Sequence, residues 1–152
     1  MTWHDGVIPI LLVLSLCIAV YYEKRGTSVS LQATLWWGGT FVLLHARGLG
    51  PVSWQESLWG AFLLAFAMAS CYLMASAIFG RTVLDPQEVL IAGVVGAALG
   101  VGKGFSALLW AGLGGGLGAI YLLARGYHPH SAMAWTPYVA LGAFLTLFFP
   151  FF

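Results

Sequence analysis

The chain alternates long apolar runs with short polar links, and this pattern predicts helices throughout. The runs are unbroken rather than alternating between apolar and polar positions, so they argue against the strands of a β-barrel. Their lengths suit helices that cross or nearly cross a bilayer. The predicted helices cover residues 7–22, 31–46, 54–79, 88–101, 105–124 and 134–149. We therefore expect a single all-α membrane domain over residues 1–152, built as a six-transmembrane-helix bundle.

The polar links mark where these helices begin and end. The first run stops at Glu23, and Gly48–Pro51 forms a turn, because glycine and proline together interrupt helices. The fourth helix is expected to start with Asp85 as its N-cap and Pro86 in its first turn. At 1.5 Å per residue, residues 88–101 are short for a bilayer core of about 30 Å. This helix is therefore expected to begin inside the protein.

The amino-acid composition indicates that these helices belong to a membrane protein. Of the 152 residues, 61% are hydrophobic and only 7% are charged, whereas soluble domains carry roughly 25% charged residues. The lipid bilayer is therefore the expected surroundings. The net charge of +1 provides no basic face for nucleic acid. Cys17 and Cys71 fall inside apolar runs, where buried thiols are expected rather than a disulfide.

The basic residues predict how the helices are oriented in the membrane. One set of links carries Lys24, Arg25, Arg81 and Arg125, and the other set carries Arg47 and Lys103. The positive-inside rule places the richer set in the cytoplasm and both termini on the other side. Glu23, Asp85 and Glu88 then all lie on the cytoplasmic side. They are three of only five acidic residues in the chain.

Glycines at helical spacing predict where helices pack. Gly96 and Gly100 lie four residues apart in the fourth helix, and Gly112 and Gly116 lie four apart in the fifth. Small residues at this spacing let two helix backbones approach closely inside a membrane. We expect these four glycines to be helix-packing positions and both helices to be buried against neighbours.

Glu23 and Glu88 form the strongest candidate for chemistry. Glu23 ends the first helix and Glu88 begins the fourth, so helix packing could bring their carboxyl groups together. Two carboxyls at one site acquire separated pKa values and can serve as an acid and a base. The structural alternative is that Glu23 pairs with neighbouring cations and Glu88 stabilises a helix N-terminus. Asp85 is a reserve candidate for the acid.

No cofactor or metal site is expected from the sequence. His128 and His130 could supply two imidazoles, but a proline separates them and no cysteine or acid is near. Such a ligand set is incomplete for zinc. The histidines are therefore expected to be solvated residues of a link.

Four stretches of the chain carry motifs that occur together, in this order, in one known family. They are Tyr22-Glu23-Lys-Arg25, Ser57-Leu-Trp-Gly60-Ala61, Glu88-Val-Leu-Ile-Ala-Gly-Val-Val-Gly-Ala-Ala-Leu-Gly100 and Trp135-Thr-Pro137-Tyr138-Val-Ala-Leu-Gly142-Ala. Together they resemble type IV prepilin peptidases, the Gly-x-Gly-Asp family of intramembrane aspartic peptidases. The first stretch falls where the family has its first aspartate, followed two residues later by a base, and the second resembles the start of the family's third helix. The third is similar to the helix that follows the family's motif aspartate, and the fourth resembles its last helix.

The resemblance implies a fold, a location and site residues. It implies the six-helix membrane core of the short family members, in the bacterial inner membrane. Glu23 and Glu88 would occupy the two catalytic positions, and the positions shared with family motifs are Arg25, Pro137, Tyr138 and Gly142. The implied partners are the leader peptides of pilin-like substrates, cut at the cytoplasmic face, or other membrane subunits.

The departures from the family pattern concern the catalytic positions. Both aspartates are glutamates here, and Asp85-Pro-Gln87 replaces the glycines that precede the motif acid. One added methylene on each side moves each carboxyl, and a displacement of about 1 Å can cost about a hundredfold in rate. We therefore predict a degenerate, non-proteolytic relative that serves as a structural or assembly subunit. The alternative is an active aspartic-type peptidase that uses Glu23 and Glu88.

Overall fold

The computed structural model describes residues 4–26, 29–79, 85–126 and 135–149. These residues form five helices and contain no strand. The helices are α1 (His4–Lys24), α2 (Leu31–Ala46), α3 (Trp54–Phe79), α4 (Pro86–Ala124) and α5 (Thr136–Phe148). The chain is therefore all-helical, and each polar link predicted from the sequence separates two helices except the one at residues 102–104, which lies within α4.

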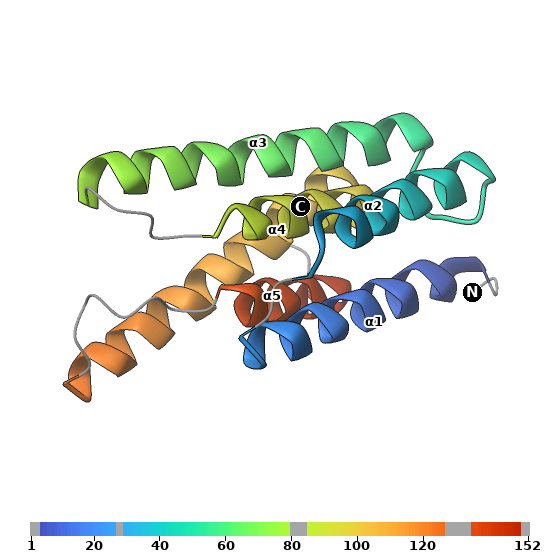
Figure 1. Ribbon diagram of the computed structural model, residues 1–152. Coiled ribbons are helices and arrows are strands. Elements are labelled where there is room, and N and C mark those ends of the chain that lie inside the picture. The colour runs from blue at the N-terminus through green and yellow to red at the C-terminus, as the bar shows by residue number, and fades with distance from the viewer. Residues whose placement is uncertain (1–3, 27–28, 80–84, 127–134, 150–152) are drawn as a thin grey trace.

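α4 contains a reversal of direction at Gly100. The backbone there has φ 77° and ψ −176°, a conformation that is essentially restricted to glycine. A Cβ on Gly104 would lie 3.4 Å from the Cα of Gly96. Residues eight apart in a straight helix are about 12 Å apart along the axis. The two halves of α4 are thus two helical segments that fold back on each other, as Figure 1 shows.

The sequence predicts a turn between two helices at residues 102–104, and the structure instead turns at Gly100. Residues 101–104 belong to the second helical segment. Glycine also occupies positions 102 and 104, so local propensity does not select one of the three. Tertiary contacts distinguish Gly100, which lies against Glu56 in the first turn of α3 and against Val52 just before that helix.

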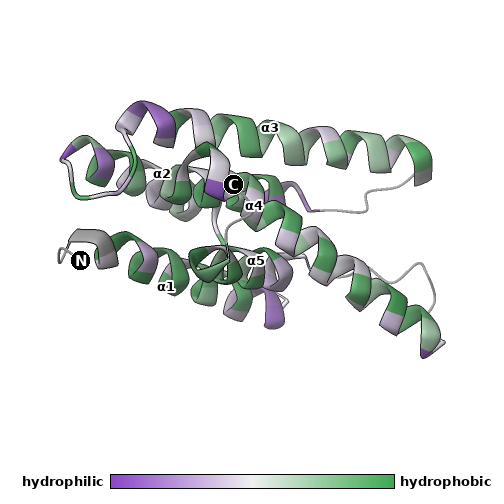
Figure 2. Ribbon diagram, turned by 180° about the vertical axis from the view of Figure 1, so that it is seen from behind, coloured by the Kyte–Doolittle hydropathy of each residue, from purple (hydrophilic) through white to green (hydrophobic). Residues whose placement is uncertain are grey.

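The first half of α4 is the centre of the fold. In both ribbon views α3 lies on one side of it and α1 and α5 lie on the other (Figures 1 and 2). Every residue from Ile91 to Gly100 is buried. The second half of α4 leaves this centre and projects away from α3 (Figure 1). The first half of α4 is therefore buried inside the bundle, whereas the second half extends outward from it.

Glycines allow the helices to approach this central segment closely. A Cβ on Gly60 of α3 would overlap the carbonyl oxygen of Gly96, and a Cβ on Gly96 would overlap that of Gly60. The hydroxyl of Ser57 donates a 2.6 Å hydrogen bond to the carbonyl of Ala97 in the same contact. Close backbone packing and a polar bond between helices are typical of helix pairs in membranes.

The outer surface of the bundle is apolar. Three helical spans, Gly6–Lys24, Trp54–Ile78 and Pro86–Ala124, are long and apolar enough to cross a membrane. Large side chains such as Trp36, which is 75% exposed, lie on the outside. In Figure 2 hydrophobic positions cover most of each helix, and the hydrophilic ones gather at ends and links. These features are compatible with a location in a membrane.

Candidate functional site

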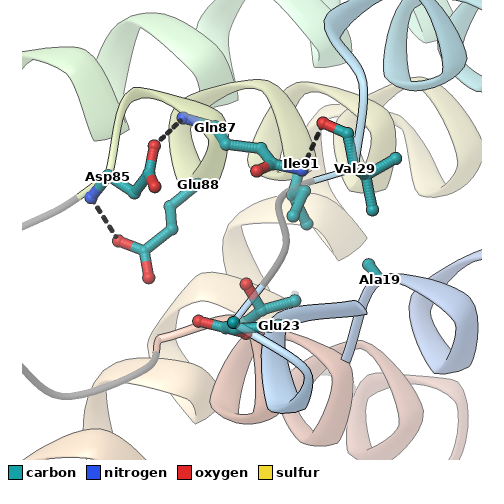
Figure 3. Close-up of a pocket in the computed structure, with 9 residues that line it drawn as sticks. Ala19, Glu23, Val29, Asp85, Gln87, Glu88 and Ile91 are labelled. Atoms are coloured by element: carbon teal, nitrogen blue, oxygen red, sulfur yellow. Dashed lines mark hydrogen bonds between the residues drawn. The ribbon is translucent and has the colours of Figure 1, made fainter. Parts of the chain in front are cut away.

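A pocket of about 370 Å³ lies where the end of α1 meets the first turns of α4 and α5. Val29, in the link between α1 and α2, lines another side. The lining residues are Ala19, Glu23, Gly26, Val29, Asp85, Gln87, Glu88, Ile91 and Thr136. Figure 3 shows seven of them by name. The pocket therefore gathers Glu23, Asp85 and Glu88, which come from two separate parts of the sequence.

Local sequence explains why the acids of α4 stand at this position. Asp85 has an extended backbone and caps the helix by accepting a 3.0 Å bond from the amide of Gln87. Glu88 reaches back to the amide of Asp85, which completes a reciprocal capping box. Pro86 occupies the first turn, where its missing N–H costs nothing. The predicted N-cap and the observed helix start agree at this position.

Glu88 joins two helices through its carboxylate. Its side chain is buried, with 4% of its surface exposed. One oxygen, Oε2, accepts a 3.1 Å bond from the amide of Asp85, and the other, Oε1, accepts a 2.9 Å bond from the amide of Trp135. Trp135 is the residue before α5, so the carboxylate ties the start of α5 to the start of α4. Backbone amides at helix N-termini are favourable partners for a negative charge.

A second polar bond fixes the opposite wall of the pocket. The side-chain amide of Gln87 donates a 2.9 Å hydrogen bond to the backbone carbonyl of Val29 (Figure 3). This bond connects the first turn of α4 to the link between α1 and α2. The polar groups of α4 therefore hold three other parts of the chain in place around one space.

Glu23 differs from Glu88 in its bonding. It is half-buried, and its Oε2 atom is shielded from solvent yet has no hydrogen-bond partner among the described residues. Figure 3 shows the carboxyl group of Glu88 turned toward the amide of Asp85, with Glu23 on another side of the pocket. The neighbouring Arg25 places its guanidinium 4.6 Å from the centre of the Tyr21 ring. Arg81, the other cation predicted on this side, lies outside the described residues.

Residues of α5 support the pocket without offering carboxyl groups. Gly142 lets α5 approach α4, since a Cβ there would overlap the carbonyl of Ala107. Pro137 lies in the first turn of α5. The hydroxyl of Tyr138 lies where a Cβ on Gly118 would be. Gly142 and Tyr138 thus pack α5 against the second half of α4.

Sequence reasoning did not identify three contributors to the pocket. Thr136 lines it with only 3% of its surface exposed, and Gln87 and the amide of Trp135 supply hydrogen bonds. Gln87 follows a recognised N-cap and could have been suspected from the sequence. The amide of Trp135 has no sequence signal, because any residue but proline supplies one.

The glycines of the second half of α4 pack differently from the sequence expectation. Gly112 and Gly116 are exposed, and a Cβ on either would meet nothing within 4 Å. Gly115 and Gly118, on another face of the helix, lie against the rings of Trp135 and Tyr138. The helix therefore packs through a different face from the one predicted. The prediction that Gly112 and Gly116 are helix-packing positions is wrong, because both lie on an open surface.

Among the residues that the structure describes, the remaining candidates for chemistry do not gather at a second polar site. Within the described part of the chain no group of three or more metal-ligating side chains lies together. His128 and His130 lie outside the described residues. His45 is buried at the end of α2, where its Nδ1 atom lies 2.8 Å from the carbonyl of Phe41. The pocket lined by Glu23 and Glu88 is therefore the site that the described chemistry favours.

Two carboxyl groups on separate helices around one space could activate water, bind a cation or stabilise helix ends. The bonds of Glu88 use both of its oxygens for helix ends, whereas Glu23 keeps one oxygen without a partner among the described residues. Comparison with known proteins adds no assignment: no protein-family model, curated protein or solved structure matches this chain.

Proposed function

We propose that this protein is a six-span membrane subunit that resembles prepilin peptidases in helix order and acts in assembly rather than in proteolysis. The observation that carries the proposal is the bonding of Glu88. Both of its carboxyl oxygens accept backbone N–H bonds, one from Asp85 and one from Trp135. Glu88 thereby serves as a clamp between two helices, in the position where the resemblance would require a catalytic acid.

The chemistry of a water-activating pair supports this distinction. A general base must reach the proton that it removes, at a heavy-atom separation of about 2.6–3.2 Å. A carboxylate whose two oxygens are both held by backbone amides is fixed in orientation, so it is not free to turn toward a water molecule. A role for Glu88 in proteolysis would require the protein to give up its helix clamp or to use the remaining lone pairs of the bound oxygens.

We propose six membrane segments, with the two halves of α4 counted separately. The reversal at Gly100 separates a first half of about 21 Å, shorter than a bilayer core of about 30 Å, from a longer second half, so the first half would enter the membrane only as part of a hairpin. In this proposal both termini lie on one side of the membrane. The positive-inside rule then predicts that the pocket faces the cytoplasm, and the family resemblance implies the bacterial inner membrane.

An active aspartic-type peptidase is the second candidate function. Glu23 favours it, because its Oε2 atom is shielded, lacks a partner among the described residues and belongs to the same pocket as Glu88. In this reading Glu23 and Glu88 activate water against the leader peptide of a pilin-like substrate. Asp85 is exposed and serves as a helix cap, so it is less suited to the role.

A cleavage assay separates the two functions. The protein is reconstituted into vesicles with a leader-bearing pilin, as wild type and as Glu23→Gln, with Glu56→Gln as a matched exposed control. We expect no cleavage by any form. We also expect the wild-type protein to purify from the membrane in a stoichiometric complex with other subunits. Cleavage that is lost in Glu23→Gln and kept in Glu56→Gln would overturn the assembly role and establish the peptidase.

A further inference from the structure

The acidic pocket lies at a lower level than the ends of two helices that extend past it. α3 and the first half of α4 are antiparallel, and Gly60 lies against Gly96. Glu88 comes eight residues before Gly96, so it is level with Met68 of α3. α3 continues eleven residues beyond Met68, to Phe79, which is about 16 Å of helix. Both ribbon views show the ends of α3 and α4 extending beyond the starts of α4 and α5 (Figures 1 and 2).

The helical segments that extend past the pocket are apolar. Residues 69–79 of α3 contain no charged side chain, and neither do residues 105–124 of α4. The span Trp54–Ile78 is long and apolar enough to cross a membrane. In a membrane these segments would lie in hydrocarbon, and the carboxyl groups of the pocket would lie below the bilayer surface. Ionisable groups at such a depth are costly and are paired with a partner.

Within the described residues, no lysine or arginine side chain lines the pocket. Its charged lining consists of the acids Glu23, Asp85 and Glu88. Arg25, two residues after Glu23, places its guanidinium over the Tyr21 ring instead. The Oε2 atom of Glu23 is shielded from solvent and has no hydrogen-bond partner in the described part of the chain. The pocket therefore lacks the positive charge that buried carboxylates require.

Thr136 contributes a second group without a partner, from the start of α5. It lines the pocket and is 97% buried, and its hydroxyl makes no hydrogen bond to another described residue. This hydroxyl and Glu23 Oε2 both favour a ligand that donates hydrogen bonds. Ammonium and guanidinium groups are donors only, with three and five N–H groups. The pocket, at about 370 Å³, is much larger than one water molecule, which occupies about 30 Å³ in the liquid.

We infer that the pocket binds one ammonium or guanidinium group, carried by a lysine or arginine in a transmembrane helix of a partner subunit. Glu23 receives the cation through Oε2, while Glu88 keeps its two helix bonds and adds negative charge nearby. A cation on a partner helix reaches this depth within the membrane, whereas a soluble cation has to pass the apolar segments. The choice of a polypeptide partner rests on the proposed assembly role, and the binding of a cation does not.

The experiment uses the full chain in phosphatidylcholine vesicles with a synthetic transmembrane helix of leucine and alanine. The helix carries one arginine, about 16 Å from the end of its apolar stretch, and a terminal dansyl group. Energy transfer from the tryptophans of the protein to dansyl measures association. The same helix with glutamine in place of arginine is the neutral comparison. We expect the arginine helix to associate about tenfold or more tightly, because charge-assisted hydrogen bonds are the stronger ones.

Three variants locate the bound cation. Glu23→Gln removes a charge without breaking a bond of Oε2, and should abolish the preference for the arginine helix. Glu56→Gln makes the same change at an exposed acid in the first turn of α3, outside the pocket, and should behave as wild type. Thr136→Val keeps the shape of the side chain and removes its hydroxyl, so it should weaken the preference about two- to tenfold.

Four outcomes would overturn the inference. Equal association of the arginine and glutamine helices with the wild-type chain would do so, and this comparison decides alone if Glu23→Gln fails to fold. An arginine preference that persists in folded Glu23→Gln would place the cation elsewhere. Binding of butylguanidinium, without any preference for the arginine helix, would assign the pocket to a small soluble cation. A preference that appears only in Arg81→Gln would mean that a cation of this chain already occupies the pocket.

The cleavage assay tests the assembly role separately from this binding assay. Cleavage that depends on Glu23 would overturn the assembly role even where the arginine helix binds. Absence of cleavage together with equal binding of the two helices would leave the assembly role standing and reject this pocket as its point of contact.

Discussion

Replacing Glu88 should destabilise the fold, because its carboxylate holds the start of α5 against the start of α4. Glu88→Ala leaves the amides of Asp85 and Trp135 without their acceptor. An unsatisfied buried donor costs about 1–3 kcal/mol. Both bonds are only partly buried, so the lower part of that range applies to each. We expect a loss of about 2–4 kcal/mol for the two bonds together.

Glu88→Gln should show half of this effect. Its amide oxygen can still accept one of the two bonds, while its NH₂ group faces the other backbone donor. The expected loss is therefore about 1–2 kcal/mol. Glu23→Gln is the matched control, since Glu23 Oε2 has no partner among the described residues and its replacement breaks no bond of that atom. Its stability should stay within about 0.5 kcal/mol of wild type.

The assay is reversible unfolding in mixed micelles with increasing denaturing detergent, followed by tryptophan fluorescence and circular dichroism. The order of stability expected is wild type and Glu23→Gln, then Glu88→Gln, then Glu88→Ala. Equal stability of Glu88→Ala and Glu23→Gln would refute the helix clamp. It would also remove the main support for an assembly role and return Glu88 to the candidates for catalysis.

Three further substitutions, with Gly102→Ala as the control for the first, test the backbone and the packing of α4. Gly100→Ala should lower the free energy of unfolding by about 1–3 kcal/mol in the same assay, because the φ of 77° at this position disfavours a residue with a Cβ. Gly102→Ala lies in open helical backbone and should be neutral or stabilising by up to about 1 kcal/mol. Ser57→Ala should cost about 1 kcal/mol by removing the buried bond to Ala97, and unchanged stability would show that this bond contributes nothing net. Gly142→Ala should cost about 1–3 kcal/mol, because its methyl group would overlap a backbone carbonyl of α4; an unaltered unfolding midpoint would contradict that packing.

Local patterns predicted where most helices lie. Residues 31–46 and 54–79 were expected as helices, and α2 and α3 span Leu31–Ala46 and Trp54–Phe79. Asp85 was expected as an N-cap and acts as one. Such features depend on a few neighbouring residues, which the sequence displays directly.

Features that depend on tertiary contacts were less accessible from the sequence. Gly100, rather than a neighbouring glycine, makes the reversal because α3 packs there. The packing face of the second half of α4 was assigned to Gly112 and Gly116, although α5 packs against Gly115 and Gly118. Several glycines in one turn of a helix give it more than one face that could pack closely against another helix. Which face does so depends on where the neighbouring helix lies.

In the candidate site, too, some features could be predicted from local sequence and others depend on tertiary contacts. The sequence indicated that Glu23 and Glu88 could meet, since both lie at helix ends on the same predicted side of the membrane. Their presence in one pocket agrees with that reasoning about position and leaves their role to experiment. The bond from Trp135 to Glu88 joins residues 47 apart in sequence, and no local pattern indicates such a partner.

The reversal at Gly100 also has a consequence for a chain placed in a bilayer. The segment from Pro86 to Leu99 rises about 21 Å, too little to cross a bilayer core of about 30 Å by itself. Its residues from Ile91 onward are buried in the folded chain. In a bilayer this segment would enter together with the longer segment that follows it, as a helical hairpin. The glycine at the tip of that hairpin would then set the unit of insertion as well as the final packing.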